Sequence, residues 1–218
     1  IRATTDDYVF IDECERLGSY WFRYSAAAND ETRFITDSGE SFGGQPVPRG
    51  QYRLFGQANA ATECKINFHP SHVVPSGESW AMEFTAKMLS LTKTRVKDHA
   101  AYRGVMINFY TPTKRFAVAF SKDLIGCLGS AEGYVQLPPG VVGSDTDFHT
   151  WKIVYNNSDM SLTISKDDKE IARFNWVLAQ DKAANVTTAL SMSVTPMQTT
   201  SDSDNIDIYL ENIKIKCY

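Results

Sequence analysis

The 218-residue sequence has no long hydrophobic run and no large excess of charge of either sign. No apolar stretch approaches the roughly 18 residues of a membrane-spanning helix, so we expect no membrane span. The formal net charge is -4, which gives a polyanion no overall attraction, so we expect no nucleic-acid partner. With 43% hydrophobic and 22% charged residues, the composition is that of an ordinary globular protein able to bury a large core.

Cysteine is scarce, and no C-x-x-C pair suggests a zinc or redox site. The four cysteines are Cys14, Cys64, Cys127 and Cys217. An even number with one near each end favours disulfides in an oxidising compartment, so we expect an extracellular, secreted or periplasmic protein whose signal peptide has been removed. Of three possible pairings we favour Cys14–Cys217 with Cys64–Cys127, because many sandwiches place their terminal strands side by side.

Two segments fit the acceptor pattern for N-linked glycosylation, which applies to eukaryotic secreted proteins. They are Asn156-Asn157-Ser158 and Asn185-Val186-Thr187.

Helical spacing is almost absent, whereas apolar and polar residues alternate along most of the chain, as in half-buried strands. Gly, Pro, Asn and Asp clusters separate the alternating segments, as in an antiparallel sandwich. Only 177–184 could form a short helix, and no repeat or linker divides the chain, so we expect one all-β domain over 1–218. The predicted strands are 20–25, 51–55, 64–69, 79–88, 102–111, 115–121, 151–156, 160–166, 170–175, 188–195 and 205–216.

Three segments carry a resemblance to known proteins. The stretch DFHTWKIVYNNSDMSLTISKDDKEIARFNW (147–176) resembles the aromatic strand, charged turn and short strand of laminin-G-like and concanavalin-like jelly rolls. DNIDIYLENIKI (204–215) and IDECERLGSYWFRYS (11–25) are similar to the last and first strands of carbohydrate-binding and carbohydrate-active sandwiches. The resemblance implies an antiparallel jelly-roll β-sandwich, and a glycan or polysaccharide as the ligand of its concave sheet.

If the apolar residues of each strand point inward, their neighbours form an outer face. Planar polar groups and aromatic rings suit the hydroxyls and faces of sugars. A plain solvated face is the open alternative, because antiparallel sheets commonly have one. The candidate ligand-binding residues are Arg53, Asn67, His69, Glu83, Lys87, Asn108, Tyr110 and Arg115.

A subset of these residues resembles the site of jelly-roll polysaccharide lyases. Arg53, Asn67 and His69, with a tyrosine such as Tyr110 or Tyr209, would perform β-elimination on a uronate. Arg and Asn would neutralise the carboxylate, His or Tyr would remove the neighbouring proton, and Tyr would protonate the leaving oxygen. The sequence departs from that family, because Asn replaces Gln and the family's aromatic-Lys-Ala-Gly segment is missing.

Other chemistry has less support in the sequence. Hydrolysis needs two carboxylates a few ångströms apart, and the E-x-D-x-x-E strand of jelly-roll glucanases does not occur. Glu83 has no acidic mate on its strand, and no G-x-S-x-G motif marks a nucleophile. We expect His149 to have a packing or turn role beside Trp151.

Calcium is the metal that the acidic termini suit, since carboxylate oxygens are its preferred ligands. The resemblance implies a structural calcium between the first and last strands, held by Asp12, Glu13, Asp204 and Asp207, with no other cofactor. A solvated acidic loop is the alternative. The sequence therefore predicts a secreted, lectin-like module, with a polysaccharide lyase and a laminin-G-like protein-interaction domain as the other hypotheses.

Overall fold

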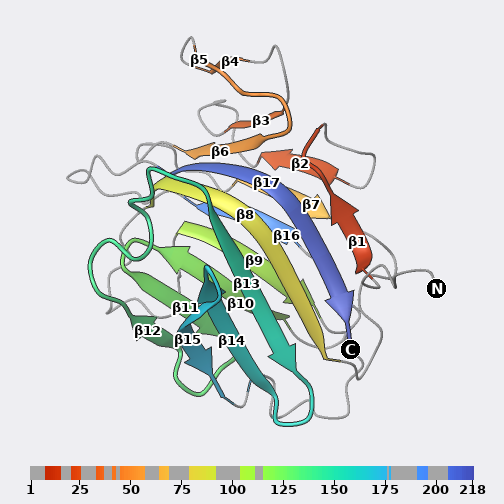
Figure 1. The fold of residues 1–218 in the computed structure, drawn as a ribbon, viewed down its shortest axis with the longest axis vertical. Helices are drawn as coiled ribbons and strands as arrows, with labels where there is room; N and C mark the ends of the chain where they lie inside the picture. Colours follow the sequence, from red (N-terminus) through yellow and green to blue (C-terminus); the bar gives the residue numbers. More distant parts are fainter. Residues whose placement is uncertain are drawn as a thin grey trace.

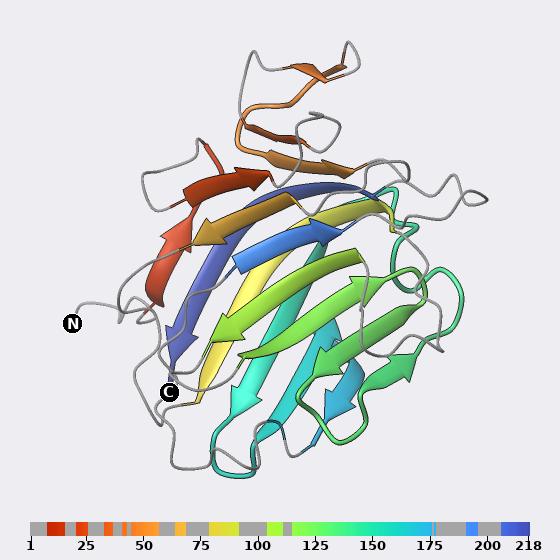
Figure 2. The same ribbon diagram turned by 180° about the vertical axis from the view of Figure 1, so that it is seen from behind.

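Two antiparallel sheets packed face to face build the protein, with sheet A in front in Figure 1 and sheet B in front in Figure 2. The structure is a computed structural model that describes residues 8–15, 21–25, 33–36, 41–42, 45–56, 64–68, 79–91, 104–110, 115–175, 177, 191–195 and 206–218.

Sheet A has eight strands, and β17 lies near its centre. Their order is β15 (Lys169–Phe174), β14 (Ser161–Lys166), β13 (His149–Asn156), β8 (Trp80–Ser90), β17 (Ile206–Cys217), β6 (Tyr52–Gly56) and β3 (Arg33–Thr36), and β1 (Tyr8–Asp12) also pairs with β17.

Sheet B has seven strands, with β9 at its centre. Their order is β12 (Tyr134–Gln136), β11 (Leu124–Leu128), β10 (Arg115–Ser121), β9 (Gly104–Tyr110), β16 (Ser191–Thr195), β7 (Cys64–Phe68) and β2 (Trp21–Ser25). A separate two-stranded sheet joins β4 (Ser41–Phe42) to β5 (Gln45–Pro46).

The alternation of apolar residues predicts most of these strands correctly. All eleven predicted strands are present, with ends that differ by at most three residues. The short strands β1, β3, β4, β5, β11 and β12 were not predicted. β11 escapes the pattern because four of its five residues, Leu124 to Cys127, are buried, so it shows no alternation.

The described residues contain no helix, and therefore none long and apolar enough to cross a membrane. The short helix expected at 177–184 lies outside the described residues, except for Val177.

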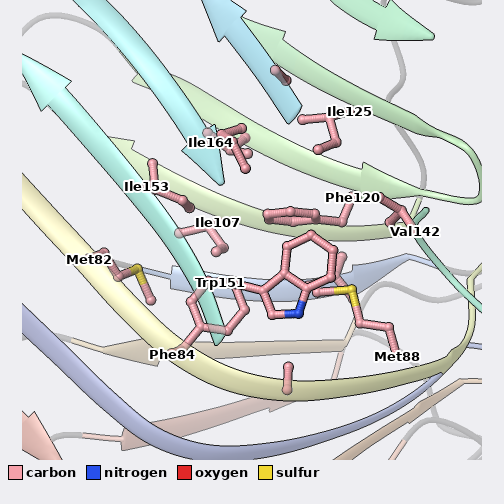
Figure 3. Close-up of a cluster of buried hydrophobic side chains, with 14 of the residues drawn as sticks. Met82, Phe84, Met88, Ile107, Phe120, Ile125, Val142, Trp151, Ile153 and Ile164 are labelled. Carbon is pink, nitrogen blue, oxygen red and sulfur yellow. The ribbon is translucent and has the colours of Figure 1, made fainter. Parts of the chain in front are cut away.

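The core lies between the two sheets, and aromatic side chains pack there among aliphatic and methionine side chains (Figure 3). Trp151 of β13 and Phe120 of β10 meet edge to face, with ring centroids 5.5 Å apart, so the two sheets contact each other through this pair. Phe84 of β8 meets Phe120 in the same way at 6.1 Å. Full burial of such a side chain stabilises the fold by about 1.5–3 kcal/mol, so this cluster fixes how the sheets pack.

Two strands pair in succession with the same edge of β17. β6 pairs with Ile206 to Leu210, and β1 pairs with the stretch from Ile213 to Lys216. Between them Asn212 has a φ of 49°, where the register of β17 against β8 shifts by one residue. The extra residue of this bulge lets the apolar residues before and after it point to the same face of the sheet. The inward-facing residues therefore stay inward along the whole strand.

Candidate functional site

The sequence-predicted site residues lie on two different sheets. Arg53, Glu83 and Lys87 belong to β6 and β8 of sheet A. Asn67, Asn108, Tyr110 and Arg115 belong to β7, β9 and β10 of sheet B, and His69 lies outside the described residues. The outer faces of two packed sheets look in opposite directions. The expectation that these residues line one common groove is therefore wrong.

The residues expected for a polysaccharide lyase site do not lie together, for the same reason. Arg53 and Tyr209 are register neighbours in sheet A, as that hypothesis requires of an arginine and a tyrosine. Asn67 and Tyr110, however, lie on sheet B, so they cannot act with Arg53 on one sugar ring.

Arg53 is also engaged within the fold. Its Nε and one terminal nitrogen donate hydrogen bonds to the two carboxylate oxygens of Asp207, at 2.8 and 2.9 Å. This pairing raises the pKa of the guanidinium, and the residue is 8% exposed. Its bidentate partner is thus already supplied by β17, and not by a substrate carboxylate.

Tyr209 stands between two cations on the outer face of sheet A. The guanidinium carbon of Arg53 lies 5.4 Å from its ring centroid, and Nζ of Lys87 lies 5.0 Å from it. Lys87 is also 5.2 Å from the ring of Phe148. Burial raises the pKa of the Tyr209 hydroxyl, and nearby Arg53 partly opposes this. These contacts order the surface but leave the tyrosine ring flanked by protein groups.

Charges of opposite sign face each other around Glu83 on sheet A. Glu83 of β8 is opposite Lys214 of β17 and opposite Lys152 of β13. Opposite charges across antiparallel strands stabilise the pairing, and they are typical of a face that stays in water. Glu83 therefore has basic neighbours on both sides and no carboxylate beside it.

Sheet B has a different outer face, which is almost free of charge. One cross-strand row runs from Ala117 of β10 to Asn108, Ser191 and Asn67 on the next three strands. Residues paired across antiparallel strands share a face, so these amide and hydroxyl residues lie on the same face as Ala117. The next row runs through Ala119, Met106, Ser193 and Lys65.

The other part of this face is apolar. Ala117 and Ala119 are fully buried, and Leu128 of β11 and Tyr134 of β12 pack against them. The outer face of sheet B thus has a buried apolar part over β10–β12 and a polar part over β9, β16 and β7 in which Lys65 carries a charge.

The described outer positions of the central strands contain no carboxylate. Glycoside hydrolysis requires a pair of carboxyl groups across the scissile bond, so these positions offer no such pair. On β9, β10 and β11 they are Gly104, Met106, Asn108, Tyr110, Arg115, Ala117, Ala119, Ser121, Leu124, Gly126 and Leu128.

The expected calcium ligands do not form one site. Asp12 is opposite Ile213 on β17, whereas Asp207 lies six positions along the same strand, about 20 Å away at about 3.3 Å per residue. Asp207 is paired with Arg53, Glu13 is exposed, and Asp204 lies outside the described residues. Within the described ranges, no group of three His, Cys, Asp or Glu residues is arranged to hold a metal. This ligand set is wrong, and calcium stays a prediction without one.

The expected disulfides are also wrong. Cys14 and Cys127 are buried free thiols. The Cys14 thiol lies beside the backbone of Asn212, about 16 Å along β17 from Cys217, and four strand spacings, about 19 Å, separate Cys64 from Cys127. A disulfide needs Cα atoms within about 7 Å. Burial raises the pKa of Cys127 to about 12 and that of Cys14 as well, so both thiols stay protonated.

His149 has the turn role expected from the sequence. Its Nδ1 lies 2.6 Å from Oδ2 of Asp167, whose other oxygen accepts a hydrogen bond from the Thr150 amide at 3.0 Å. Its Nε2 lies 3.8 Å from Asp145, which also pairs with Lys166. The histidine therefore joins the start of β13 to the turn between β14 and β15.

Sequence reasoning missed the contribution of β16 to the outer face of sheet B. Ser191 and Ser193 lie within a correctly predicted strand, but nothing in the sequence says that this strand lies between β7 and β9. The alternation S-M-S-V-T was the available signal, and it identifies the polar positions of the strand without giving their neighbours.

No family model and no curated protein matches the sequence. Solved structures with low sequence identity do resemble the fold. The chain is similar to a glycoside hydrolase family 16 endo-glucanase from Bacteroides ovatus, with 13% identity and a TM-score of 0.55, over 95% of this chain and 100% of the enzyme. It is also similar to lectin I-B4 from Griffonia simplicifolia, with 11% identity and a TM-score of 0.50, over 90% and 99% of the two chains.

A third similar structure is the binding domain of botulinum neurotoxin serotype G, with 10% identity and a TM-score of 0.52. The match covers 96% of this chain but only 47% of that domain, so the chain spans about half of its length. At these identities the likeness shows the fold alone. The two antiparallel sheets and these structural neighbours identify the protein as an all-β jelly-roll sandwich of the concanavalin-like kind.

Proposed function

We propose that the protein is a lectin-like module that binds a neutral glycan or polysaccharide on the outer face of sheet B. The observation that carries the proposal is the uncharged polar row Asn67–Ser191–Asn108 on the outer side of sheet B. A sugar ring presents hydroxyl groups at its rim. Amide and hydroxyl side chains in a row match those groups.

The contrast between the two sheets supports the choice of face. Sheet A carries paired charges such as Glu83 with Lys152 and Lys214, and water solvates such pairs well. The outer rows of sheet B lack these pairs, so a neutral ligand displaces water there at a lower desolvation cost. Structural neighbours that include a lectin and glucan-degrading enzymes are compatible with a carbohydrate ligand.

A glycan array followed by titration calorimetry tests the proposal. We expect binding to neutral polysaccharides, and a loss of about fivefold to tenfold in affinity for Asn108→Ala, because one hydrogen bond to the sugar contributes about 1–1.4 kcal/mol. Lys152→Ala on sheet A is the matched control, and we expect it to bind like the wild type. A loss of binding in Lys152→Ala but not in Asn108→Ala would place the ligand on the other face.

The lyase hypothesis has a separate readout. Uronate polysaccharides incubated with the protein should give no ultraviolet absorbance from an unsaturated product. A rise that disappears in Tyr110→Phe would overturn the binding-only proposal. Silence on the array together with no lyase activity would favour a protein-interaction module instead.

We also propose that the protein is secreted, on grounds that differ from the cysteine argument made from the sequence. The free thiols of Cys14 and Cys127 exclude both expected disulfides, so those pairs no longer support an oxidising compartment. Polysaccharides are largely found outside the cytoplasm, so the expected ligand is what favours an extracellular location. Fractionation of the native host would test it, and a cytoplasmic pool alone would contradict it.

A further inference from the structure

The turn between β13 and β14 presents one of the two glycosylation patterns at the surface. Asn156 is the last residue of β13, and Asn157 and Ser158 begin the turn. Asn156 and Ser158 are both exposed. Figure 1 shows this turn at the lower end of the molecule, where it extends beyond the strands that it joins.

The two groups that define the pattern contact each other directly. Oδ1 of Asn156 accepts a hydrogen bond from the backbone amide of Ser158 at 3.0 Å and another from its hydroxyl at 2.8 Å. Such a side-chain turn fixes the asparagine carbonyl toward the protein. The amide nitrogen Nδ2 has no hydrogen-bond partner among the described residues, so it is the part of the side chain left available for reaction.

The rest of the turn is well anchored. The amide of Asn157 donates to the hydroxyl of Ser79 at 3.0 Å, and the amide of Ser161 donates to Asp159 at 3.0 Å. Val177 donates its amide to the carbonyl of Met160 at 2.9 Å, although Met160 has a φ of 55°. The pattern therefore lies on a defined turn, and a sugar on Asn156 would extend into solvent without displacing core residues.

From this geometry we propose that Asn156 is an acceptor for N-linked glycosylation when the protein is made in a eukaryotic secretory pathway. The donor is a polyprenyl-diphosphate-linked oligosaccharide. Nδ2 of Asn156 forms a bond to the anomeric carbon and loses one proton. The bond from that carbon to the diphosphate oxygen breaks, and the polyprenyl diphosphate leaves with the electron pair, so nothing is oxidised or reduced.

The modification would not obstruct the proposed glycan-binding face. Asn156 is opposite Ser161 on β14, in sheet A, whereas that face belongs to sheet B. Removal of the attached oligosaccharide should therefore leave ligand affinity unchanged. The proposal does not depend on that binding activity, because its readout is the mass of the protein.

The test is expression of the full chain behind a cleavable secretion signal in a eukaryotic host. Asn185→Gln is included as the background, so that only the pattern at Asn156 remains. We expect treatment with peptide N-glycosidase to remove one oligosaccharide mass and to convert Asn156 to aspartate in the corresponding peptide. Secreted, folded protein with unmodified Asn156 would overturn the proposal.

Three further variants make the test specific. Ser158→Ala removes the hydroxyl and should abolish the modification, whereas Ser158→Thr keeps the hydroxyl and should retain it. Asn157→Gln changes the middle position alone and is the matched control that should also retain it. Since Ser158→Ala leaves Asn156 in place, it also covers the case in which Asn156→Gln fails to fold. A mass loss that persists in Ser158→Ala would contradict the assignment to Asn156.

Discussion

Asp12 is a buried carboxylate whose hydrogen bonds are supplied by the protein. It is 4% exposed, and both of its oxygens lie 3.0 Å from the hydroxyl of Tyr52. One of them also accepts the amide of Cys14 at 2.8 Å. The residue therefore connects the end of β1 to β6, which gives this buried carboxylate a structural role.

Replacement of this carboxylate should cost stability. Asp12→Ala removes the carboxylate that accepts hydrogen bonds from the Tyr52 hydroxyl and the Cys14 amide, so we expect a loss of about 2–3 kcal/mol in the free energy of unfolding. Urea denaturation measures it. Glu13→Ala, at the exposed neighbouring position, is the control and should change stability by less than about 0.5 kcal/mol. Equal effects of the two variants would contradict this role for Asp12.

Asp167 should make part of the stability depend on pH. The hydrogen bond from His149, and next the Thr150 amide, hold the pKa of Asp167 below its ordinary value. Because its pKa is lower in the folded state, this carboxylate stabilises the fold above the unfolded-state pKa of about 3.9, and the effect is lost as the pH falls through the folded-state pKa. The side chain is 55% exposed, so solvent screening keeps the effect small.

Asp167→Asn should therefore lower the urea midpoint near about pH 6, and the difference from the wild type should be lost as the pH falls through the folded-state pKa of Asp167. Asp168→Asn is the matched control, because both residues have positive φ angles, 48° and 61°, which asparagine tolerates. A difference for Asp167→Asn that stays constant with pH would show that ionisation of this carboxylate is not the cause.

At the scale of elements, the segment between β12 and β13 is held against the end of β8. Asp145 donates its amide to the carbonyl of Met88 at 2.9 Å, and its carboxylate accepts from Lys166. Gly143 comes so close to Leu91 that an added Cβ would lie 3.0 Å from the leucine Cβ. Leu91 is 1% exposed, so it has little room to move.

Two glycines in this segment allow the cost of backbone strain and the cost of a steric clash to be measured separately. Gly143 and Gly140 have nearly the same φ, +84° and +85°, but a Cβ on Gly140 meets nothing within 4 Å. Gly140→Ala should cost about 1 kcal/mol through its positive φ, and Gly143→Ala about 1–3 kcal/mol more through the clash with Leu91. Calorimetric unfolding would measure both, and identical losses would contradict the close approach.

At the scale of the whole molecule, the sequence predicts which residues point inward but not which sheet they belong to. Arg53, Asn67 and Glu83 are close in sequence, and each lies between two apolar residues of its predicted strand. The chain nevertheless passes from sheet A to sheet B and back between them, through β6, β7 and β8. Alternation reports burial within a strand, whereas strand order depends on contacts between distant segments, so the fold was predictable and the convergence of the site was not.

The position of β17 has a consequence for how the chain is synthesised. It is the last strand in chain order, yet it separates β8 from β6 and β1 within sheet A. At about 5–20 residues per second, the stretch between Gly56 and Ile206 takes on the order of 10 s to leave the ribosome. During that time β1 and β6 lack the strand on which they assemble, and their unpaired edges are open to other chains. The growing polypeptide would therefore depend on chaperones until β17 emerges and both halves of the sheet join.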